Sequence, residues 1–533
     1  MTNFFKRLKH FQHFIFPLLS GVLIGTSYPP FPSWAVTFCW IPLWFSIVDE
    51  ENLKSVFWRG WVTQFVLTLI GFHWVAHTAH DFGDLPWSVS ILALLLFAAL
   101  FHLHIPLSLT LAKWIDKKTH GLASAPTFFL LCALLQLLIE RIWPMIFPWH
   151  LGYSALYSHL EIDQMAEFIG FQGLSSLFFL LNALFAAGLY YSQEQKKKSI
   201  ALILSGFALF LALDVTGALI HPSTESDRSV SVMIVQANIG QIEKMAADLG
   251  NKNLNSNSPQ LQEAILQKYI HLTNEGLALY PQTQVIVWPE TAIPDFYDLE
   301  FLTRPRQMQL RSQIAKWKRA VIMGAYSNDF GTQNVYNALF IFNDKGELAA
   351  PPYRKTHLLA FGEYLPLGET FPVLYKLLPF VSSFARGKGP EVQSFHVNGE
   401  EFRAAPQICY ESLDANFARK AALQSPDFLV NITNDSWFGT TTEPFQHGTM
   451  SWARAIETRR PLIRSTNTGQ SSIVLPDGKV VLQSPLQQEW YGMAKVPLLP
   501  PQPTFYMLYG HLDWVIYLVF LLILVGRLKT KHV

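Results

Sequence analysis

Three residues suited to nucleophilic chemistry each follow a short β-like run in the second half of the chain. They are Glu290, Lys355 and Cys409. Strand ends in α/β sheets are where catalytic groups gather, because rigid strands aim side chains into a shared crevice. A carboxylate can take the proton of a thiol, the thiolate can attack a carbonyl carbon, and an ammonium group can stabilise the resulting oxyanion. A nearby lysine also lowers the pKa of a thiol. The three residue types therefore predict acyl-transfer chemistry with Cys409 as the nucleophile.

The cysteine content supports this choice of nucleophile. The chain has three cysteines, and Cys39 and Cys132 lie within apolar segments. Cys409 has no cysteine partner in the more polar part of the chain, so an internal disulfide is excluded there. A lone thiol is a candidate nucleophile, although a buried, inert cysteine is the more common case. An isolated Glu or Lys is likewise most often a solvated surface charge.

Composition indicates a membrane protein rather than a soluble enzyme. The chain has 533 residues, of which 50% are hydrophobic and 15% are charged, whereas about a quarter of a soluble protein is charged. The net charge is +1, and no basic face stands out, which argues against a nucleic-acid partner. The apolar excess lies between residues 11 and 220, so the composition changes along the chain.

Eight segments are near the length of about 20 residues that spans a bilayer. The predicted spans are 11–29, 33–48, 56–76, 87–112, 122–141, 167–190, 199–220 and 509–527. The second is short and is compatible with a tilted or re-entrant segment. The first has no small-residue cleavage site after it, and we interpret it as a retained signal anchor.

Basic residues predict the orientation. Clusters of Lys and Arg lie before the first span, after the fourth and sixth spans, and after the eighth, which is typical of cytoplasmic loops. The predicted organisation is a membrane domain of seven helices over 1–220, a catalytic domain over 221–508 and a last helix with a cytoplasmic tail over 509–533. The catalytic domain then lies on the periplasmic side of the cell inner (cytoplasmic) membrane.

Within residues 221–508, short β-rich runs alternate with helical stretches. The predicted strands are 230–239, 285–288, 321–325, 338–342, 404–409, 428–432 and 472–475, and the predicted helices are 259–279, 304–318 and 446–460. This alternation predicts an α/β domain with a central sheet.

Three motifs carry a resemblance to a known family. Trp-Pro-Glu-Thr at 288–291, Lys355, and Ile-Cys-Tyr-Glu at 408–411 occur in the order seen in the nitrilase (carbon–nitrogen hydrolase) superfamily, which uses a Glu–Lys–Cys triad. More narrowly, the whole chain resembles the bacterial apolipoprotein N-acyltransferase family. The resemblance implies a bundle of about eight transmembrane helices plus a nitrilase-like α-β-β-α sandwich, and it implies neither a metal nor an organic cofactor.

The resemblance also implies further site residues. They are Glu363, Tyr410 and Glu411 as active-site support, and Trp437, Met245 and Trp149 as substrate-binding residues. Glu363 would assist Lys355, a backbone N–H near Tyr410 would face the oxyanion, and Trp437 would form a pocket wall. Met245 stands where the family commonly has a tryptophan, in a loop that acts as a lid.

The resemblance implies a two-step reaction. An acyl chain passes from a phospholipid, by resemblance phosphatidylethanolamine, to Cys409 as a thioester. It then passes to the α-amino group of the diacylglyceryl-modified N-terminal cysteine of a lipoprotein. A membrane-tethered amidase or nitrilase with the same triad is the nearest alternative, and the residues do not distinguish water from an amine as acceptor. A transporter with a ligand-binding domain is a third possible function. The predicted spans lack the paired mid-helix charges expected of a transporter, which argues against it.

A histidine run near the third span could also hold a metal ion. His73, His77 and His80, with Asp81, have the spacing of one helix face. Because the run lies at a predicted membrane edge, where amphipathic side chains are common, we favour an interfacial role.

Overall fold

The computed structural model divides the chain into two compact units. Met1–His221 and Leu508–Val533 form the first unit, and Pro222–Met507 forms the second. The structure describes residues 2–530 except 120, 122, 221, 223, 225, 241–257, 330, 333, 369 and 378–380. Each unit has its own core and is described by itself.

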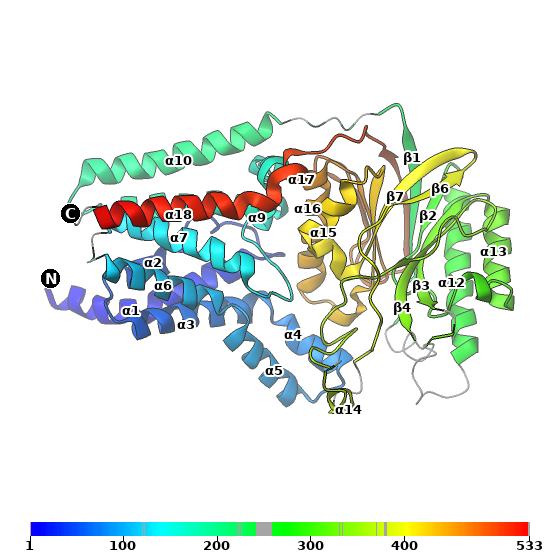
Figure 1. Cartoon of the computed structure of the whole chain (residues 1–533), viewed down its shortest axis with the longest axis horizontal. Coiled ribbons are helices and arrows are strands. Elements are labelled where there is room, and N and C mark those ends of the chain that lie inside the picture. Colours follow the sequence, from blue (N-terminus) through cyan, green and yellow to red (C-terminus); the bar gives the residue numbers. More distant parts are fainter. Residues whose placement is uncertain are drawn as a thin grey trace. The chain divides into compact units, whose positions relative to one another are not determined.

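The first unit is helical (Figure 1). Its main helices are α1 (Thr2–Gly25), α2 (Ile41–Ile47), α3 (Leu53–Gly71), α4 (Trp74–His77), α5 (Trp87–Leu100), α6 (His104–Lys118), α7 (Ala125–Ile142), α8 (Tyr153–Tyr157), α9 (Ala166–Tyr190), α10 (Lys196–Ala218) and α18 (Asp513–Thr530). Among the described residues, five stretches are long and apolar enough to cross a membrane: Trp87–Lys118, Ala125–Ile142, Glu161–Tyr190, Lys196–Ala218 and Phe505–Leu528. The predicted membrane bundle is confirmed, whereas the count of eight spans stays a prediction.

The other three predicted spans take different forms. The first overlaps the end of α1, whose apolar described part is His13–Gly25, and extends four residues beyond it. The second contains only α2, which is seven residues long. The third coincides with α3, which has 19 residues but contains charged and polar side chains. Arg59 of α3 is buried, and its guanidinium pairs with Glu50 and donates to the Ser46 carbonyl. Arg59 thus lowers the hydropathy of this helix, although its charge is paired with Glu50.

Helix α10 presents an apolar face to its surroundings. Ile200, Leu204, Phe207 and Leu211 are 58–63% exposed and are spaced three or four residues apart, so they lie on one side of the helix. A stripe of this kind is unfavourable in water and is stable where lipid covers it. It is the pattern expected of a membrane-facing helix.

The second unit contains two six-stranded sheets (Figure 1). The first has the order β12-β1-β2-β3-β4-β5 and the second β11-β10-β9-β8-β7-β6. The strands are β1 (Ser229–Gln236), β2 (Val285–Val287), β3 (Ala320–Asn328), β4 (Val335–Phe342), β5 (Tyr353–Arg354), β6 (Gln393–Val397), β7 (Glu400–Ile408), β8 (Phe428–Thr433), β9 (Leu462–Thr466), β10 (Ser472–Val474), β11 (Val480–Gln483) and β12 (Trp490–Pro497).

The sheets pack face to face because both faces of their central strands are apolar. In β1, Val230, Val232 and Ile234 belong to a core shared with apolar residues of β7, β8 and β9. The alternate residues Met233 and Val235 belong to a second core with helix residues on the opposite face. Successive side chains of a strand point to opposite faces, so one strand serves both cores.

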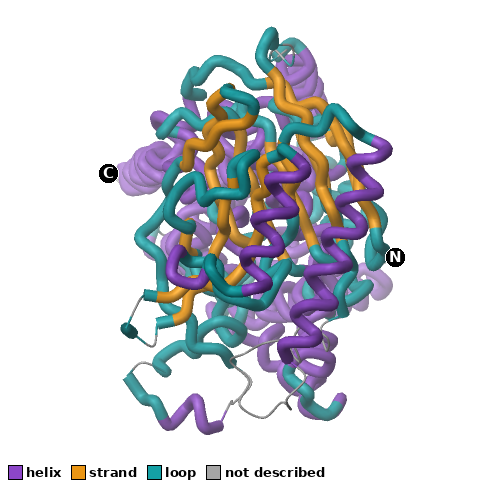
Figure 2. Tube along the Cα trace, turned by 90° about the vertical axis from the view of Figure 1, so that its right-hand side faces the viewer, coloured by secondary structure: helices purple, strands orange, loops and turns teal. Residues whose placement is uncertain are grey.

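Helices cover the outer faces of the two sheets. On the first sheet lie α12 (Ser258–Leu279) and α13 (Pro305–Trp317), whose apolar residues join the second core. On the second lie α15 (Ala415–Ala422) and α16 (Glu443–Thr458). Figure 2 shows helices lying in front of the strands. The predicted α-β-β-α sandwich is confirmed.

Candidate active site

Sheet topology brings the ends of β2 and β5 to one edge of the first sheet. β2 is parallel to β3, β3 is antiparallel to β4, and β4 is antiparallel to β5. The two strands therefore run in the same direction, and their carboxyl ends lie at the same edge of the sheet. Glu290 follows β2 by three residues and Lys355 follows β5 directly. Sequence places these residues 65 positions apart, and the sheet makes them neighbours.

Lys355 lies between two carboxylates, and all three side chains are buried. Its ammonium Nζ is 3.2 Å from Glu290 Oε1 and 2.8 Å from a carboxylate oxygen of Glu363. Lys355 is 1% exposed, and both glutamates are 5% exposed. Burial alone would lower the pKa of Lys355, but the charges of Glu290 and Glu363 outweigh it and hold that pKa well above its usual value. The lysine is therefore a fixed positive charge.

Asn337, a residue that the sequence reasoning missed, links the two carboxylates. Its Nδ2 donates to Glu290 Oε1 at 2.6 Å and to Glu363 Oε1 at 2.9 Å. The backbone N–H of Leu359 donates to the second oxygen of Glu363 at 2.8 Å. These bonds fix both carboxylates against Lys355. A signal was present, because Asn337 is a polar residue directly before the predicted apolar strand 338–342.

Cys409 lies at a sharp transition from strand to helix. It follows β7 and begins the 3₁₀ turn Cys409–Leu413, with a φ of +51°, a region that L-residues seldom adopt. Burial raises the pKa of its thiol well above the usual value, the Glu290 carboxylate raises it further, and the Lys355 charge opposes both. The resting group is thus a neutral thiol, and it needs a base.

Glu290 has the electrostatics of such a base. Burial raises the pKa of this carboxyl, Lys355 lowers it, and Glu363 raises it, with a net increase. A carboxylate with a raised pKa accepts a proton more readily than an exposed one. The structure thus brings the predicted Glu290, Lys355, Cys409 and Glu363 into one site and adds Asn337 to it.

Glu411 has a structural environment distinct from that of Glu363. Its carboxylate is fully buried and accepts hydrogen bonds from the Tyr353 hydroxyl at 2.8 Å and from the backbone N–H groups of Thr356 at 2.6 Å and Ile408 at 2.8 Å. These donors come from the segments that carry Lys355 and Cys409. Glu411 therefore ties the lysine strand to the cysteine strand. Tyr410, between Cys409 and Glu411, is partly buried.

The predicted substrate-binding residues fall in different places. Trp437 is partly buried, and its ring lies over the backbone of Gly362, where an added Cβ would come within 3.3 Å of Cζ3. It thus packs beside Glu363. Met245 lies outside the described residues.

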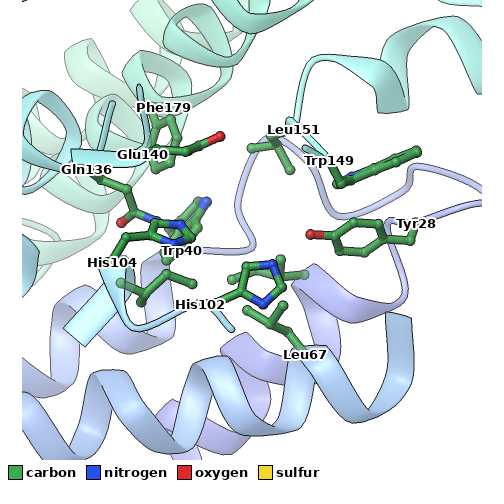
Figure 3. A pocket seen from close by; sticks show the side chains of 12 residues that line it. Tyr28, Trp40, Leu67, His102, His104, Gln136, Glu140, Trp149, Leu151 and Phe179 are labelled. Atoms are coloured by element: carbon green, nitrogen blue, oxygen red, sulfur yellow. The ribbon is translucent and has the colours of Figure 1, made fainter. Parts of the chain in front are cut away.

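Trp149 belongs to the first unit, where it lines a small cavity of about 30 Å³ (Figure 3). The tryptophan is buried, and its ring centroid is 4.7 Å from that of Tyr28. The hydroxyl of Tyr28 and the carboxylate of Glu140 point toward the same space, beside His102 (Figure 3). The cavity is therefore lined by polar as well as aromatic groups.

The histidine run of the first unit is engaged with its own surroundings. His80 stacks on Trp87 with ring centroids 4.2 Å apart, and its Nδ1 lies 2.8 Å from the Leu85 carbonyl. Across the described part of the chain, one group of His, Cys, Asp and Glu side chains has ligand atoms close enough to share a metal ion. It is Asp435, Glu443 and His447 in the second unit, not the histidine run.

Comparisons with known proteins give a consistent result along the chain. The family model "Carbon-nitrogen hydrolase" matches residues 232–499, and "Apolipoprotein N-acyltransferase N-terminal domain" matches residues 20–184. An apolipoprotein N-acyltransferase of Bdellovibrio bacteriovorus is 46% identical over 99% of this chain and 96% of its own length. One of Azotobacter vinelandii is 30% identical over 88% of this chain and 86% of its own length.

One solved structure covers about half of the chain. Saccharomyces cerevisiae Nit3, a member of branch 10 of the nitrilase superfamily, is 17% identical and covers 54% of this chain and 97% of its own, with a TM-score of 0.37. The sequence relatives match both units, and the 46% identity extends over nearly the whole length. The chain therefore belongs to the apolipoprotein N-acyltransferase family, within the carbon–nitrogen hydrolase superfamily.

Proposed function

We propose that this chain transfers an acyl chain from a phospholipid, through a thioester on Cys409, to the α-amino group of the diacylglyceryl-modified N-terminal cysteine of lipoproteins. The observation that carries the proposal is the buried site in which Lys355 contacts Glu290 and Glu363, in a chain related over its whole length to apolipoprotein N-acyltransferases. The charges fit the chemistry, since a neutral thiol, a base and a fixed cation are all required.

In the first step, Glu290 takes the proton of the Cys409 thiol as the sulfur attacks the ester carbonyl carbon. A carbon–sulfur bond forms, and the negative charge that develops on the carbonyl oxygen faces the Lys355 ammonium. The ester carbon–oxygen bond then breaks. The leaving alkoxide takes the proton from Glu290 and departs as a lysophospholipid, which leaves the acyl thioester.

In the second step, the lipoprotein amine attacks the thioester carbonyl carbon. Glu290 accepts a proton from the attacking nitrogen, the carbon–sulfur bond breaks, and the thiolate regains a proton from Glu290. The product is an amide, and the enzyme returns to its starting state. One site therefore serves two substrates in turn, which predicts ping-pong kinetics.

The membrane unit suits lipid substrates. Moving each buried CH₂ of an acyl chain from lipid into water costs about 0.8 kcal/mol, so a site supplied from the bilayer avoids most of that penalty. Basic residues at the end of α6 and the start of α10, Lys117, Lys118 and Lys196, support a cytoplasmic location for those helix ends. On this basis we place the catalytic domain on the periplasmic side of the inner membrane.

A direct test is to incubate the full-length enzyme with phosphatidylethanolamine alone and to search the peptide containing Cys409 for an acyl thioester by mass spectrometry. A Cys409-linked acyl group that disappears on addition of a diacylated lipopeptide, with formation of the triacylated product, is the expected result. Release of free fatty acid to water without lipopeptide acylation would instead favour the amidase or nitrilase alternative. Absence of any thioester would contradict the scheme.

We expect a pH effect from the carboxylate pair. A protonated Glu290 cannot accept the thiol proton, so kcat/KM should fall as the pH drops through the pKa of Glu290, which burial raises above the ordinary value of a glutamate. Glu363 raises that pKa, and Glu363→Gln removes its negative charge. The acid limb of the kcat/KM profile should therefore move to lower pH in this variant. The exposed Glu347→Gln should leave the limb in place, and an unchanged limb in Glu363→Gln would contradict the electrostatic coupling.

A second effect is expected at Gly324, which lies under the loop that carries Glu290. The N–H of Gly324 donates to the Pro289 carbonyl at 3.1 Å, and an added Cβ would lie 2.6 Å from the Cα of Glu290. Gly324→Ala should push this loop away, reduce the free energy of unfolding by about 1–3 kcal/mol, and lower kcat by about 100-fold through the displaced base. Thermal unfolding and lipopeptide acylation measure both. Gly526→Ala, where an added Cβ meets no atom within 4 Å, is the matched control.

A further inference from the structure

The backbone carbonyl of Cys409 is held by two hydrogen bonds from residues behind the site. Ser412 Oγ donates to it at 3.0 Å, and Asn431 Nδ2 donates to it at 3.3 Å. Both donors are fully buried. Because Cys409 has a positive φ, its conformation is disfavoured unless surrounding contacts impose it. These two bonds fix the peptide unit that follows the thiol.

One buried arginine is connected to both donors, to Asn431 directly and to Ser412 through Ser451. Arg464, on β9, is 0% exposed. Its Nη1 donates to Asn431 Oδ1 at 2.5 Å and to Ser451 Oγ at 3.2 Å. The first contact orients the Asn431 amide so that its Nδ2 faces the Cys409 carbonyl. In the second contact Arg464 donates to Ser451, whose Oγ is 2.7 Å from Ser412 Oγ.

Counting protons gives the direction of the serine chain. Each hydroxyl has one proton, and Ser412 Oγ donates to the Cys409 carbonyl. Ser451 then accepts from Arg464 and shares its one proton between Ser412 Oγ at 2.7 Å and the His447 carbonyl at 2.9 Å. The resulting sequence of donors, from Arg464 to Ser451 to Ser412 to the Cys409 carbonyl, leaves every member bonded. Aligned hydrogen bonds of this kind polarise and strengthen one another.

Arg464 is itself fixed by a buried carboxylate. Its Nη2 is 2.9 Å from Asp435 Oδ2, and His447 Nδ1 is 3.0 Å from Asp435 Oδ1. The backbone of Gly469 lies so near that an added Cβ would be 2.0 Å from Asp435 Oδ2. This is the same cluster whose spacing would suit a metal ion, but the guanidinium already neutralises Asp435 and would repel a cation. The cluster is therefore better described as an anchor for Arg464.

We propose that Arg464 is a positioning residue for the nucleophile: through Asn431, and through Ser451 and Ser412, it holds the carbonyl of Cys409 and thereby the left-handed turn that presents the thiol. This inference rests on the proposed role of Cys409. It makes the back of the site, which never touches substrate, a determinant of the acylation rate.

The serine chain offers the sharpest test, because its members are small and uncharged. Ser412→Ala and Ser451→Ala should each lower kcat for lipopeptide acylation about fivefold to tenfold, as expected for one lost hydrogen bond, with KM unchanged. The double variant should lose no more than either single variant, since both serve one chain. The rate of Cys409 alkylation by iodoacetamide should fall in parallel.

Thr458→Val is the matched control on the same helix. The Thr458 hydroxyl donates to the Arg454 carbonyl at 2.7 Å and has no part in the chain to Cys409, so kcat should stay at the wild-type value. A purely structural role of the serines would lower the melting temperature but leave kcat and the alkylation rate unchanged well below it, and would overturn the proposal. Additive losses in the double variant would also contradict it. Failure of the proposed function is distinguishable, because acylation would then survive Cys409→Ala.

Discussion

Cys409→Ala is expected to lower kcat for lipopeptide acylation by about 10⁴-fold or more, the size of effect seen when a nucleophile is removed from a covalent mechanism. No other group in the described site replaces the thiol, because Glu290 and Glu363 are already engaged with Lys355. The acyl thioester should disappear with the activity. Measurement of triacylated lipopeptide by mass spectrometry, with wild type and variant in the same detergent or bilayer, checks both outcomes.

The chain provides matched controls for this substitution. Cys39 and Cys132 are buried cysteines of the first unit, and Cys132→Ala makes the same chemical change in the unit that does not contain Cys409. Its kcat should equal that of the wild type. Cys409→Ser keeps the shape of the site but has a weaker nucleophile, so it should retain the wild-type melting temperature and remain inactive. Acyl transfer by Cys409→Ala would contradict the enzyme mechanism and would favour a transport or binding role.

Lys355→Met is expected to produce the second large effect, and it acts in two ways. The oxyanion loses its cation, which corresponds to a fall in kcat of about 100-fold to 1,000-fold. Two buried carboxylates, Glu290 and Glu363, also lose the ammonium group that lies 3.2 and 2.8 Å from them. Breaking a buried ion pair in this way destabilises a protein by about 3–5 kcal/mol. Acylation kinetics and thermal unfolding measure the two losses separately.

The stability loss in Lys355→Met should depend on pH in a defined direction. Lys355 lowers the pKa of Glu290, whereas burial and Glu363 raise it, so removing the lysine raises this pKa further. A carboxyl whose pKa is higher in the folded than in the unfolded state favours the folded protein at low pH, and this contribution is lost as the pH rises through the folded pKa. The difference in melting temperature from wild type should therefore be smaller at pH 5 than at pH 8.

A surface lysine provides the control for these measurements. Lys345 is exposed in the same unit, and Lys345→Met should change neither kcat nor the melting temperature. Lys355→Arg should not restore activity, because a planar guanidinium does not fit the space of one ammonium between two carboxylates. A kcat within tenfold of wild type in Lys355→Met would show that Lys355 does not stabilise the transition state.

Local patterns were sufficient to predict the elements of the second unit that present the chemistry. The apolar runs before Glu290 and Cys409 correspond to β2 and β7, and the predicted helices 259–279 and 304–318 correspond to α12 and α13. Apolar residues recur every 2 residues in a half-buried strand and every 3.6 residues in a half-buried helix. Each pattern is visible within one segment, so it can be recognised without knowing the partner segments. The predicted sandwich and the family rest instead on the resemblance carried by the motifs around Glu290, Lys355 and Cys409.

Local patterns were less informative for the membrane unit. The predicted span 33–48 contains the seven-residue helix α2, and the span at 56–76 includes Arg59, whose charge is paired with Glu50. Hydropathy averages over a window, so it does not register a charge that a partner neutralises. How α2 and α3 cross or enter a bilayer depends on such pairs, which the sequence alone does not specify.

Several active-site contacts could only be decided by the tertiary structure. In the sequence, Asn337 is a single polar residue beside a predicted strand, and Arg464 is a single charge within an apolar run. In the structure, each side chain is at the centre of a buried hydrogen-bond network. The pairing of β1 with β12 joins Ser229 to Pro497, a contact between distant segments that no local pattern encodes. Glu411, beside the nucleophile in sequence, holds strands together through backbone N–H groups.

The sequence by itself predicted which residues carry the chemistry, because a thiol, a carboxylate and an ammonium group are the residue types that acyl transfer through a covalent intermediate needs. It also determined that each follows a strand. Only the tertiary structure decided that Lys355 lies between two carboxylates and that the peptide after Cys409 is held from behind. Those contacts join residues far apart in the chain, and their energies exist only once the two sheets have packed and excluded water.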